Sequence, residues 1–235
     1  MKIFEKLVTE NSRSYVLKTL LYNITNLYLE PGQKISENEI SKMLGISRTP
    51  VREAIIEINR LGFIDIIPQK GSYISKIDYN IIDNCSFLRL MVEKEILKLA
   101  CKGISESYIE SLKLNLENER LAIYSDDIDK RIQLDNNFHR LIFEAVDKIW
   151  LYNIILAQML HFDRLRILSL KSTQNKGDRT VKDHENILYS VINKDFELSK
   201  MLITKHLSRY KEEKELLSKH PQYFIQNTNT NNINF

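Results

Sequence analysis

Apolar residues recur every three to four positions along most of the chain, which is the spacing of one face of an α-helix. Before residue 77 this spacing predicts three helices, and the pattern then changes to two short runs of strand type. Helix-breaking and turn-forming residues set their limits. The predicted helices cover about 15–27, 37–45 and 47–61, and the predicted strands cover 63–67 and 72–75.

Short polar signatures support these limits. Ser36 and Glu39 match a capping box at the start of the second helix, because Ser36 can cap it and Glu39 can reach back. Pro50 falls in the first turn of the third helix, where a missing N–H costs little. Residues 68–71 read Pro-Gln-Lys-Gly and predict a tight turn. Two short helices followed by a hairpin predict a winged helix-turn-helix over residues 1–77.

After residue 77 the strand signals end and the helical spacing continues. We expect a mainly α protein, with this second part an all-α antiparallel helical bundle over residues 78–218. Residues 219–235 are expected to form a flexible tail, since the last ten are mostly Asn and Thr. The six predicted helices cover about 79–102, 105–125, 127–146, 149–172, 180–193 and 195–217, with breaks at Gly103, Asp126, Lys148, Gly177 and Asn193-Lys194.

Composition narrows the class of protein. Of the 235 residues, 43% are apolar and 28% are charged, which is typical of a globular chain. Two cysteines, Cys85 and Cys101, cannot make a disulfide framework and suit a reducing compartment. No secretory leader opens the chain, and the most apolar stretch, 151–160, is too short to cross a bilayer. We therefore expect a cytoplasmic protein with no membrane partner.

The positive charge is concentrated in the first third of the chain. Residues 1–77 hold 11 basic and 8 acidic residues, whereas the remaining 158 hold 23 of each, so the whole net charge of +3 falls in the first part. This imbalance is small, but it indicates a polyanion-binding unit beside a neutral one.

The third predicted helix has the features of a DNA-reading helix. Arg48, Thr49 and Arg52 occupy an exposed arc at its N-terminus, and arginine is well shaped to hold guanine O6 and N7. Ser47 and the backbone there can hold phosphate, and Lys70 and Gly71 suit the tip of a wing that touches DNA. Periodicity leaves open a solvated helix with ordinary surface arginines.

Four residues of the second part form a candidate metal site. Asp135 and His139 are four apart, so they project from one face of a helix. His184 lies 10 residues before Lys194 and His206 lies 12 after it, so an antiparallel hairpin places both at similar heights, about 15 and 18 Å from the turn. One carboxylate and three imidazoles suit a divalent transition metal. We expect Zn²⁺ first, with Ni²⁺, Mn²⁺ or Fe²⁺ as alternatives, because ligand type does not decide among them.

The first part resembles the DNA-binding domain of GntR-type transcriptional regulators. The resemblance rests on residues 35–40, Ile-Ser-Glu-Asn-Glu-Ile, and on residues 44–55, which include Ser-Arg-Thr-Pro-Val-Arg-Glu-Ala. It implies that Arg48 and Arg52 contact operator bases and that Thr49 and Gly71 approach the DNA. Some relatives carry a further DNA-contacting Arg where this chain has Asn38, so the operator preference is expected to differ.

The second part resembles FCD domains, the all-helical effector domains of the FadR branch of GntR regulators. The matching segments surround Asp135, His139, His184 and His206, which correspond to the ligands of metal-binding members. Members that bind fatty acyl-CoA lack these four residues, and six helices indicate the shorter form of the domain. The resemblance implies a homodimer, a palindromic operator and a small organic acid effector, and we expect the regulator to act as a repressor.

Three arginines are candidates for binding the carboxylate of such an effector. Arg89 resembles a family position that faces the cavity, and Arg164 and Arg166 lie on the fourth predicted helix of the second part. A guanidinium can clamp a carboxylate with two hydrogen bonds. The alternative for Arg89 is a surface ion pair with Glu93, four residues on.

Two other functions stay open from the sequence. In one, the metal ion is itself the signal and no organic effector exists. In the other, the chain is a helical metal-dependent hydrolase fused to a DNA-binding unit. The chain has no adjacent His-Asp pair of the kind that helical phosphohydrolases use, which weighs against an enzyme.

Overall fold

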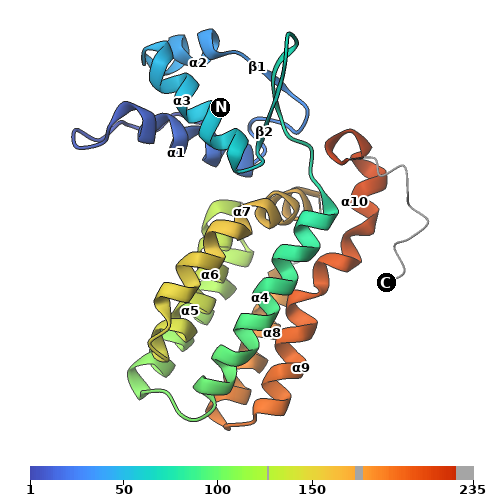
Figure 1. Cartoon of the computed structure of the whole chain (residues 1–235). Helices are drawn as coiled ribbons and strands as arrows, with labels where there is room; N and C mark the ends of the chain where they lie inside the picture. Colours follow the sequence, from blue (N-terminus) through green and yellow to red (C-terminus); the bar gives the residue numbers. More distant parts are fainter. Residues whose placement is uncertain (126, 173–176, 226–235) are drawn as a thin grey trace. The chain divides into compact units, whose positions relative to one another are not determined.

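A computed structural model describes residues 1–125, 127–172 and 177–225 (Figure 1). The chain forms two compact units. The first unit contains residues 1–80 together with 163–167 and the segment from 215 onward, and the second contains 81–162 and 168–214. The expected break at Asp126 and the Asn-rich end of the expected tail, 226–235, lie outside the described residues.

Three helices form the core of the first unit. They are α1 (Ser12–Thr25), α2 (Glu37–Leu44) and α3 (Arg48–Arg60). The side chain of Asn11 caps α1 by accepting from the backbone N–H of Ser14, and Gly45 ends α2 in the left-handed conformation at φ 65°. Ser36 stands at the N-cap of α2 as predicted, but its side chain makes no capping hydrogen bond, so the expected capping by Ser36 is not formed. Fully buried apolar side chains join α1 to α3: Val16, Leu20, Ile24, Val51, Ala54 and Ile58.

A small sheet completes the winged helix-turn-helix. Its strands are β1 (Lys34–Ile35), β2 (Ile64–Ile67) and β3 (Gly71–Ile74), in the order β1-β3-β2 and all antiparallel. Ile64 pairs with Ile74 and Ile67 pairs with Gly71, which makes the predicted hairpin. The two-residue strand β1 was not predicted, because so short a segment shows no alternation.

The second unit is made of helices that lie side by side (Figure 1). Six helices correspond to the six that the sequence predicted, and α5 packs on both α6 and α8. In the described residues they are α4 (Tyr79–Ala100), α5 (Glu106–Ile123), α6 (Ile128–Ala145), α7 (Ile149–Ser172), α8 (Gly177–Ile192) and α9 (Phe196–Leu207).

The last predicted helix is shorter than expected. It was predicted to run to residue 217, but α9 ends at Leu207 and the chain continues as a 3₁₀ turn, η1 (Arg209–Glu213), and a short helix, α10 (Lys214–Lys219). Beyond the break, Arg209 binds Asp183 and the hydroxyl of Tyr210 donates to Asp83. These long-range contacts replace helix continuation, which explains why local spacing did not reveal the break.

Residues 219–225 correct the prediction of a tail that begins at residue 219. A second 3₁₀ turn, η2 (Pro221–Tyr223), leads to a parallel bridge between Ile77 and Phe224. The backbone N–H of Ile77 donates to Tyr223 at 2.8 Å, and that of Ile225 donates to Ile77 at 3.0 Å. Phe224 is buried and stacks on Tyr79, so this segment is part of the first unit.

Within the described part of the chain, no helix combines the length and the apolar character needed to cross a bilayer.

Candidate functional site

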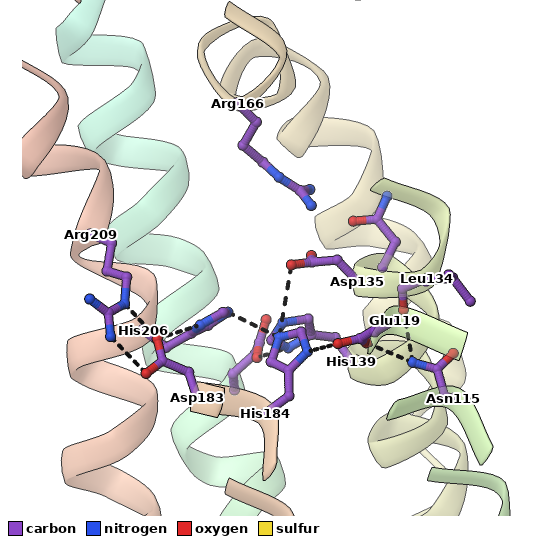
Figure 2. Close-up of polar contacts among 12 residues, drawn as sticks. Asn115, Glu119, Leu134, Asp135, His139, Arg166, Asp183, His184, His206 and Arg209 are labelled. Carbon is purple, nitrogen blue, oxygen red and sulfur yellow. Dashed lines mark hydrogen bonds and ion pairs between the residues drawn. The ribbon is translucent and has the colours of Figure 1, made fainter. Parts of the chain in front are cut away.

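Four predicted metal ligands lie together inside the second unit (Figure 2). Helix α6 carries Asp135 and His139, α8 carries His184 and α9 carries His206. Each residue offers one ligand atom, and these four atoms all lie within 4.8 Å of one another. His184 Nε2 is 3.4 Å from His206 Nε2 and 3.8 Å from Asp135 Oδ1.

These separations fit a single metal ion. Two donors that each lie about 2.1 Å from one ion are roughly 3.0–3.4 Å apart when they occupy neighbouring positions around it. The distance from His184 Nε2 to His206 Nε2, 3.4 Å, is at the upper end of this range, and the distance to Asp135 Oδ1, 3.8 Å, is slightly above it. Small side-chain rotations would therefore bring the four atoms to ligand distance of a common centre.

A carboxylate orients each imidazole from behind. In every case the carboxylate lies at Nδ1, so Nε2 is the atom that faces the other ligands. Carboxylates hold metal-binding histidines in this way because they fix both the tautomer and the ring orientation. The pairs are His139 with Glu93 at 2.7 Å, His184 with Glu119 at 2.9 Å and His206 with Asp183 at 3.4 Å.

Sequence reasoning did not assign these three carboxylates to the site. Glu93 and Glu119 come from helices α4 and α5, which carry none of the four ligands. One signal was available for Glu119, because it interrupts the buried face of α5 formed by Leu112, Leu116 and Ala122. A buried acid inside an apolar helix face needs a partner, and here that partner is His184.

One buried nitrogen at the centre has no partner. The Nε2 atom of His139 makes no hydrogen bond within the described residues, although the side chain is only 1% exposed. Such an atom is costly in a protein interior unless it meets a metal or another polar group. The donor set and this orphaned nitrogen both fit a divalent transition metal.

The surroundings of His139 and His206 favour the neutral form of these two imidazoles. Burial lowers the pKa of His139 well below its usual value, and the charge of Arg89 lowers it further. Burial also lowers the pKa of His206, against the hydrogen bond to Asp183. Neutral imidazoles are the form that ligates metals, so the site is ready for a metal at neutral pH.

Asp183 is held as a carboxylate by Arg209. Burial alone would raise the pKa of Asp183, but hydrogen bonds from His206 and Arg209 outweigh it and hold the pKa far below its usual value. Arg209 contacts both carboxylate oxygens, with Nη2 at 2.7 Å from Oδ1 (Figure 2). The chain just after α9 thereby fixes the residue that orients His206.

Arg89 lies in the wall of a cavity next to this cluster. The alternative ion pair of Arg89 with Glu93 is present, but it is buried rather than at the surface, with Arg89 and Glu93 6% and 5% exposed. The Nε atom of Arg89 donates to Glu93, whose other oxygen contacts His139. The cavity thus shares Glu93 with the metal ligands. Its lining residues are Arg89, Glu93, Asn136, Phe143, Tyr152, Ile155, Leu156 and Met159.

The other two predicted effector-binding arginines are placed differently. Both belong to the short part of α7, residues 163–167, that forms part of the first unit. Arg164 is buried, donates to the carbonyl and hydroxyl oxygens of Ser75 and lies over the ring of Phe63. Arg166 pairs with Asp163 on its own helix at 3.1 Å. These contacts occupy Arg164 within the first unit and pair Arg166 with Asp163, and the effector-binding role that the sequence predicted for both stays a prediction.

All six residues predicted to face DNA are exposed in the first unit. Arg48, Thr49 and Arg52 stand at the N-terminal end of α3, and Ser47 is its N-cap. Lys70 and Gly71 lie at the tip of the β2–β3 hairpin, where Gly71 adopts φ 118°, a conformation that favours glycine. Arg48 is 67% exposed and lies 3.8 Å from Glu37, a separation that leaves it solvated.

Comparisons with known proteins agree with both units. Residues 14–74 match the model of the gntR family of bacterial regulatory proteins, and residues 86–209 match the FCD domain. The chain is 30% identical over 204 residues to the HTH-type transcriptional repressor RspR of Escherichia coli, covering 87% of this chain and 89% of that one. It is 27% identical over 188 residues to the gluconate operon transcriptional repressor of Bacillus subtilis, covering 75% and 74%.

A solved structure shares the fold. The E. coli protein McbR/YncC superimposes with a TM-score of 0.71 at 17% identity, covering 90% of this chain and all of that one. The matching families and the curated relatives are transcriptional regulators rather than enzymes. Taken with the winged helix-turn-helix and the helical bundle, these matches show that the chain belongs to the GntR family of transcriptional regulators, in its FadR-like branch with an FCD domain.

Proposed function

We propose that this regulator is a repressor that binds a palindromic operator as a homodimer and responds to a small organic acid at a metal-centred site. The observation that carries the proposal is the buried cluster of Asp135, His139, His184 and His206, in a chain that also presents exposed arginines on a DNA-reading helix. The named relatives support repression, since two of them are repressors.

DNA would be read by the N-terminal end of α3. Arg48 and Arg52 would contact base edges in the major groove, and Thr49 and Ser47 would contact phosphate at the helix end. Lys70 and Gly71 would bring the wing against the backbone. All six residues are exposed, which this role requires.

The metal ligands would be Asp135, His139, His184 and His206, with Zn²⁺ the first candidate and Ni²⁺, Mn²⁺ or Fe²⁺ the alternatives. A bound divalent ion would supply a Lewis-acidic centre for a carboxylate group of the effector. Arg89 is the cationic side chain best placed to bind the effector carboxylate beside the metal. It lines the neighbouring cavity, and its charge lowers the pKa of His139. Because one relative is named as the repressor of the gluconate operon, sugar acids are the class of effector to test first.

A homodimer is supported by an apolar surface on α4. Phe87, Leu88 and Met91 are 64%, 40% and 51% exposed and lie within two turns of the helix. Large apolar side chains that gather on one exposed face often mark a protein interface. A symmetric partner would also match the two half-sites of a palindromic operator.

A second function, in which the metal ion alone is the signal, is favoured by one contact. Arg89 already forms an ion pair with Glu93, which offsets part of its attraction for an incoming acid. An effector carboxylate would have to share Arg89 with Glu93, through the Nη donors of the guanidinium, or bind elsewhere. A metal ion meets no such competition at Nε2 of His139.

One experiment tests the proposal with untagged, full-length protein. Metal content is measured for the wild type and for His184→Ala/His206→Ala, and duplex DNA selected from a random library is then titrated with each protein. We expect about one metal per wild-type chain, lost in the variant. We also expect sugar acids or dicarboxylates to change the affinity for DNA, and to do so only when the protein is loaded with metal.

Two outcomes would change the conclusion. If the metal alone changes DNA affinity and no acid does, the second function replaces the first. If the wild type binds no metal after dialysis against zinc, nickel and manganese, the metal-centred site is wrong.

A further inference from the structure

Asn115 makes a buried hydrogen-bond network behind the metal-ligand cluster (Figure 2). It lies on α5, is 3% exposed and offers no ligand atom. Its Nδ2 donates to Glu119 Oε1 at 2.7 Å and to the carbonyl oxygen of Leu134 at 3.0 Å. Its Oδ1 accepts from Asn137 Nδ2 at 2.7 Å. Both amide hydrogens are therefore used, one by Glu119 on the same helix and the other by Leu134 on helix α6.

The first of these hydrogen bonds leads to His184. Glu119 has two carboxylate oxygens, of which Oε1 accepts from Asn115 and Oε2 contacts His184 Nδ1 at 2.9 Å. The hydrogen bond from Asn115 restrains the rotation of the carboxylate about its last bond. Because the carboxylate is fixed, the imidazole of His184 is held with Nε2 toward Asp135 and His206.

The second hydrogen bond leads to helix α6. Leu134 directly precedes the ligand Asp135, so its carbonyl oxygen belongs to the turn that carries this carboxylate. The same turn carries Phe138, whose ring stacks on that of His184 with centroids 4.0 Å apart and planes 6° apart. The Asn115 side chain thus fixes α6 and, through Glu119, the ligand of α8.

We infer that Asn115 is a positioning residue of the metal centre, which sets Asp135 and His184 in register through Leu134 and Glu119. The inference rests on the proposed metal site. A side chain of the same size that cannot donate two hydrogen bonds would leave the Leu134 carbonyl and Glu119 without their common donor. Asn115 then acts on metal affinity without touching the ion.

The test measures Zn²⁺ affinity of the full-length protein by competition with a chromophoric chelator. Asn115→Asp keeps the shape of the side chain but removes both donor hydrogens, and we expect it to weaken Zn²⁺ binding by about 10–100-fold. Asn23→Asp is the matched control, because Asn23 is a fully buried amide of α1 that donates to Lys2 and Thr19. It should bind Zn²⁺ like the wild type.

A double variant separates positioning from a general loss of structure. In Asn115→Asp/Glu119→Gln, the new amide of residue 119 can donate to the new carboxylate, and its oxygen can still accept from His184 Nδ1. We expect the double variant to bind Zn²⁺ about tenfold more tightly than Asn115→Asp. Glu119→Gln alone should be weakened, because it places two amide donors face to face.

The outcomes distinguish this inference from the proposed function. If the wild type binds Zn²⁺ and Asn115→Asp binds it equally well, the inference is wrong and the metal site stands. If the losses of the two single variants simply add in the double variant, Asn115 does not act through Glu119 and the inference is also wrong. If the wild type binds no Zn²⁺, the metal site and the inference fall together.

Discussion

The imidazole of His139 donates through Nδ1 to the carboxylate of Glu93, 2.7 Å away, and its buried Nε2 is left without a hydrogen-bond partner in the described part of the chain. Glu93 also accepts from Arg89, which lines the neighbouring cavity. A single carboxylate therefore connects the proposed metal centre to the small cavity that Arg89 lines. This connection gives a physical path by which one could affect the other, because a change at Arg89 alters the partner that orients His139.

Removing the charge of Glu93 should weaken metal binding. Glu93→Gln keeps the size of the side chain but makes it a poorer acceptor for His139 and for Arg89, so we expect Zn²⁺ affinity to fall by about 10–100-fold. Glu95→Gln is a matched control on the same helix, since the side chain of Glu95 is 68% exposed and pairs with Lys98. Competition with a chelator measures the Zn²⁺ affinity of both variants. If Glu93→Gln binds Zn²⁺ as tightly as Glu95→Gln, the role given to Glu93 is wrong.

Acid should destabilise the metal-free protein through its buried histidines. The pKa values of His139 and His206 are lowered by burial, so the unfolded chain binds more protons than the folded one below about pH 6.5. The stability that these groups contribute is complete above that pH and is lost as the pH falls toward their folded-state pKa values. Asp183, whose pKa is also lowered, adds a further loss below about pH 4.

Urea unfolding of chelator-treated protein at several pH values between 7.5 and 5 measures this effect. The free energy of unfolding should fall with pH in the wild type and fall less steeply in His139→Gln, which has one titrating group fewer. A wild-type stability that stays constant over this range would show that the two imidazoles are not buried as described.

The sequence predicted the four clustered candidate ligands better than it predicted the residues around them. Asp135 and His139 share a helix face by spacing, and the turn at Lys194 brings His184 near His206, so local geometry was sufficient for these pairs. Glu119 reaches His184 from another helix, 65 residues away in the chain. No local spacing encodes that contact, which depends on how α5 packs against α8.

Contacts between residues far apart in the sequence also decide where helix α9 ends and which partner Arg164 has. Local spacing continued the last helix past residue 207, but the contacts of Arg209 with Asp183 and of Tyr210 with Asp83 end it there. Arg164 was a candidate carboxylate clamp from its helix alone, and local spacing did not reveal that its guanidinium donates to the carbonyl oxygen of Ser75. In both cases the deciding partner is far away in the sequence.

Arg164 should be a structural residue of the first unit rather than an effector ligand. Burial lowers its pKa to about 10, partly opposed by the charge of Asp65, and its guanidinium donates to Ser75. Arg164→Met would leave the Ser75 carbonyl without this donor, which costs about 1–3 kcal/mol. We expect faster amide hydrogen exchange in residues 71–79 and unchanged Zn²⁺ affinity. Loss of organic acid binding with unchanged exchange would instead restore the effector role.

Removing the C-terminal segment should loosen the end of β3 and the start of α4. A chain that stops at Lys219 loses the burial of Phe224, worth about 1.5–3 kcal/mol, together with both backbone hydrogen bonds to Ile77. The matched control stops at Ile225 and keeps every one of these contacts. Hydrogen exchange at Ile77 and Tyr79 should accelerate in the shorter chain and match full-length protein in the control. If the shorter chain exchanges at the full-length rate, the pairing of Ile77 with residues 223–225 does not stabilise this part of the first unit.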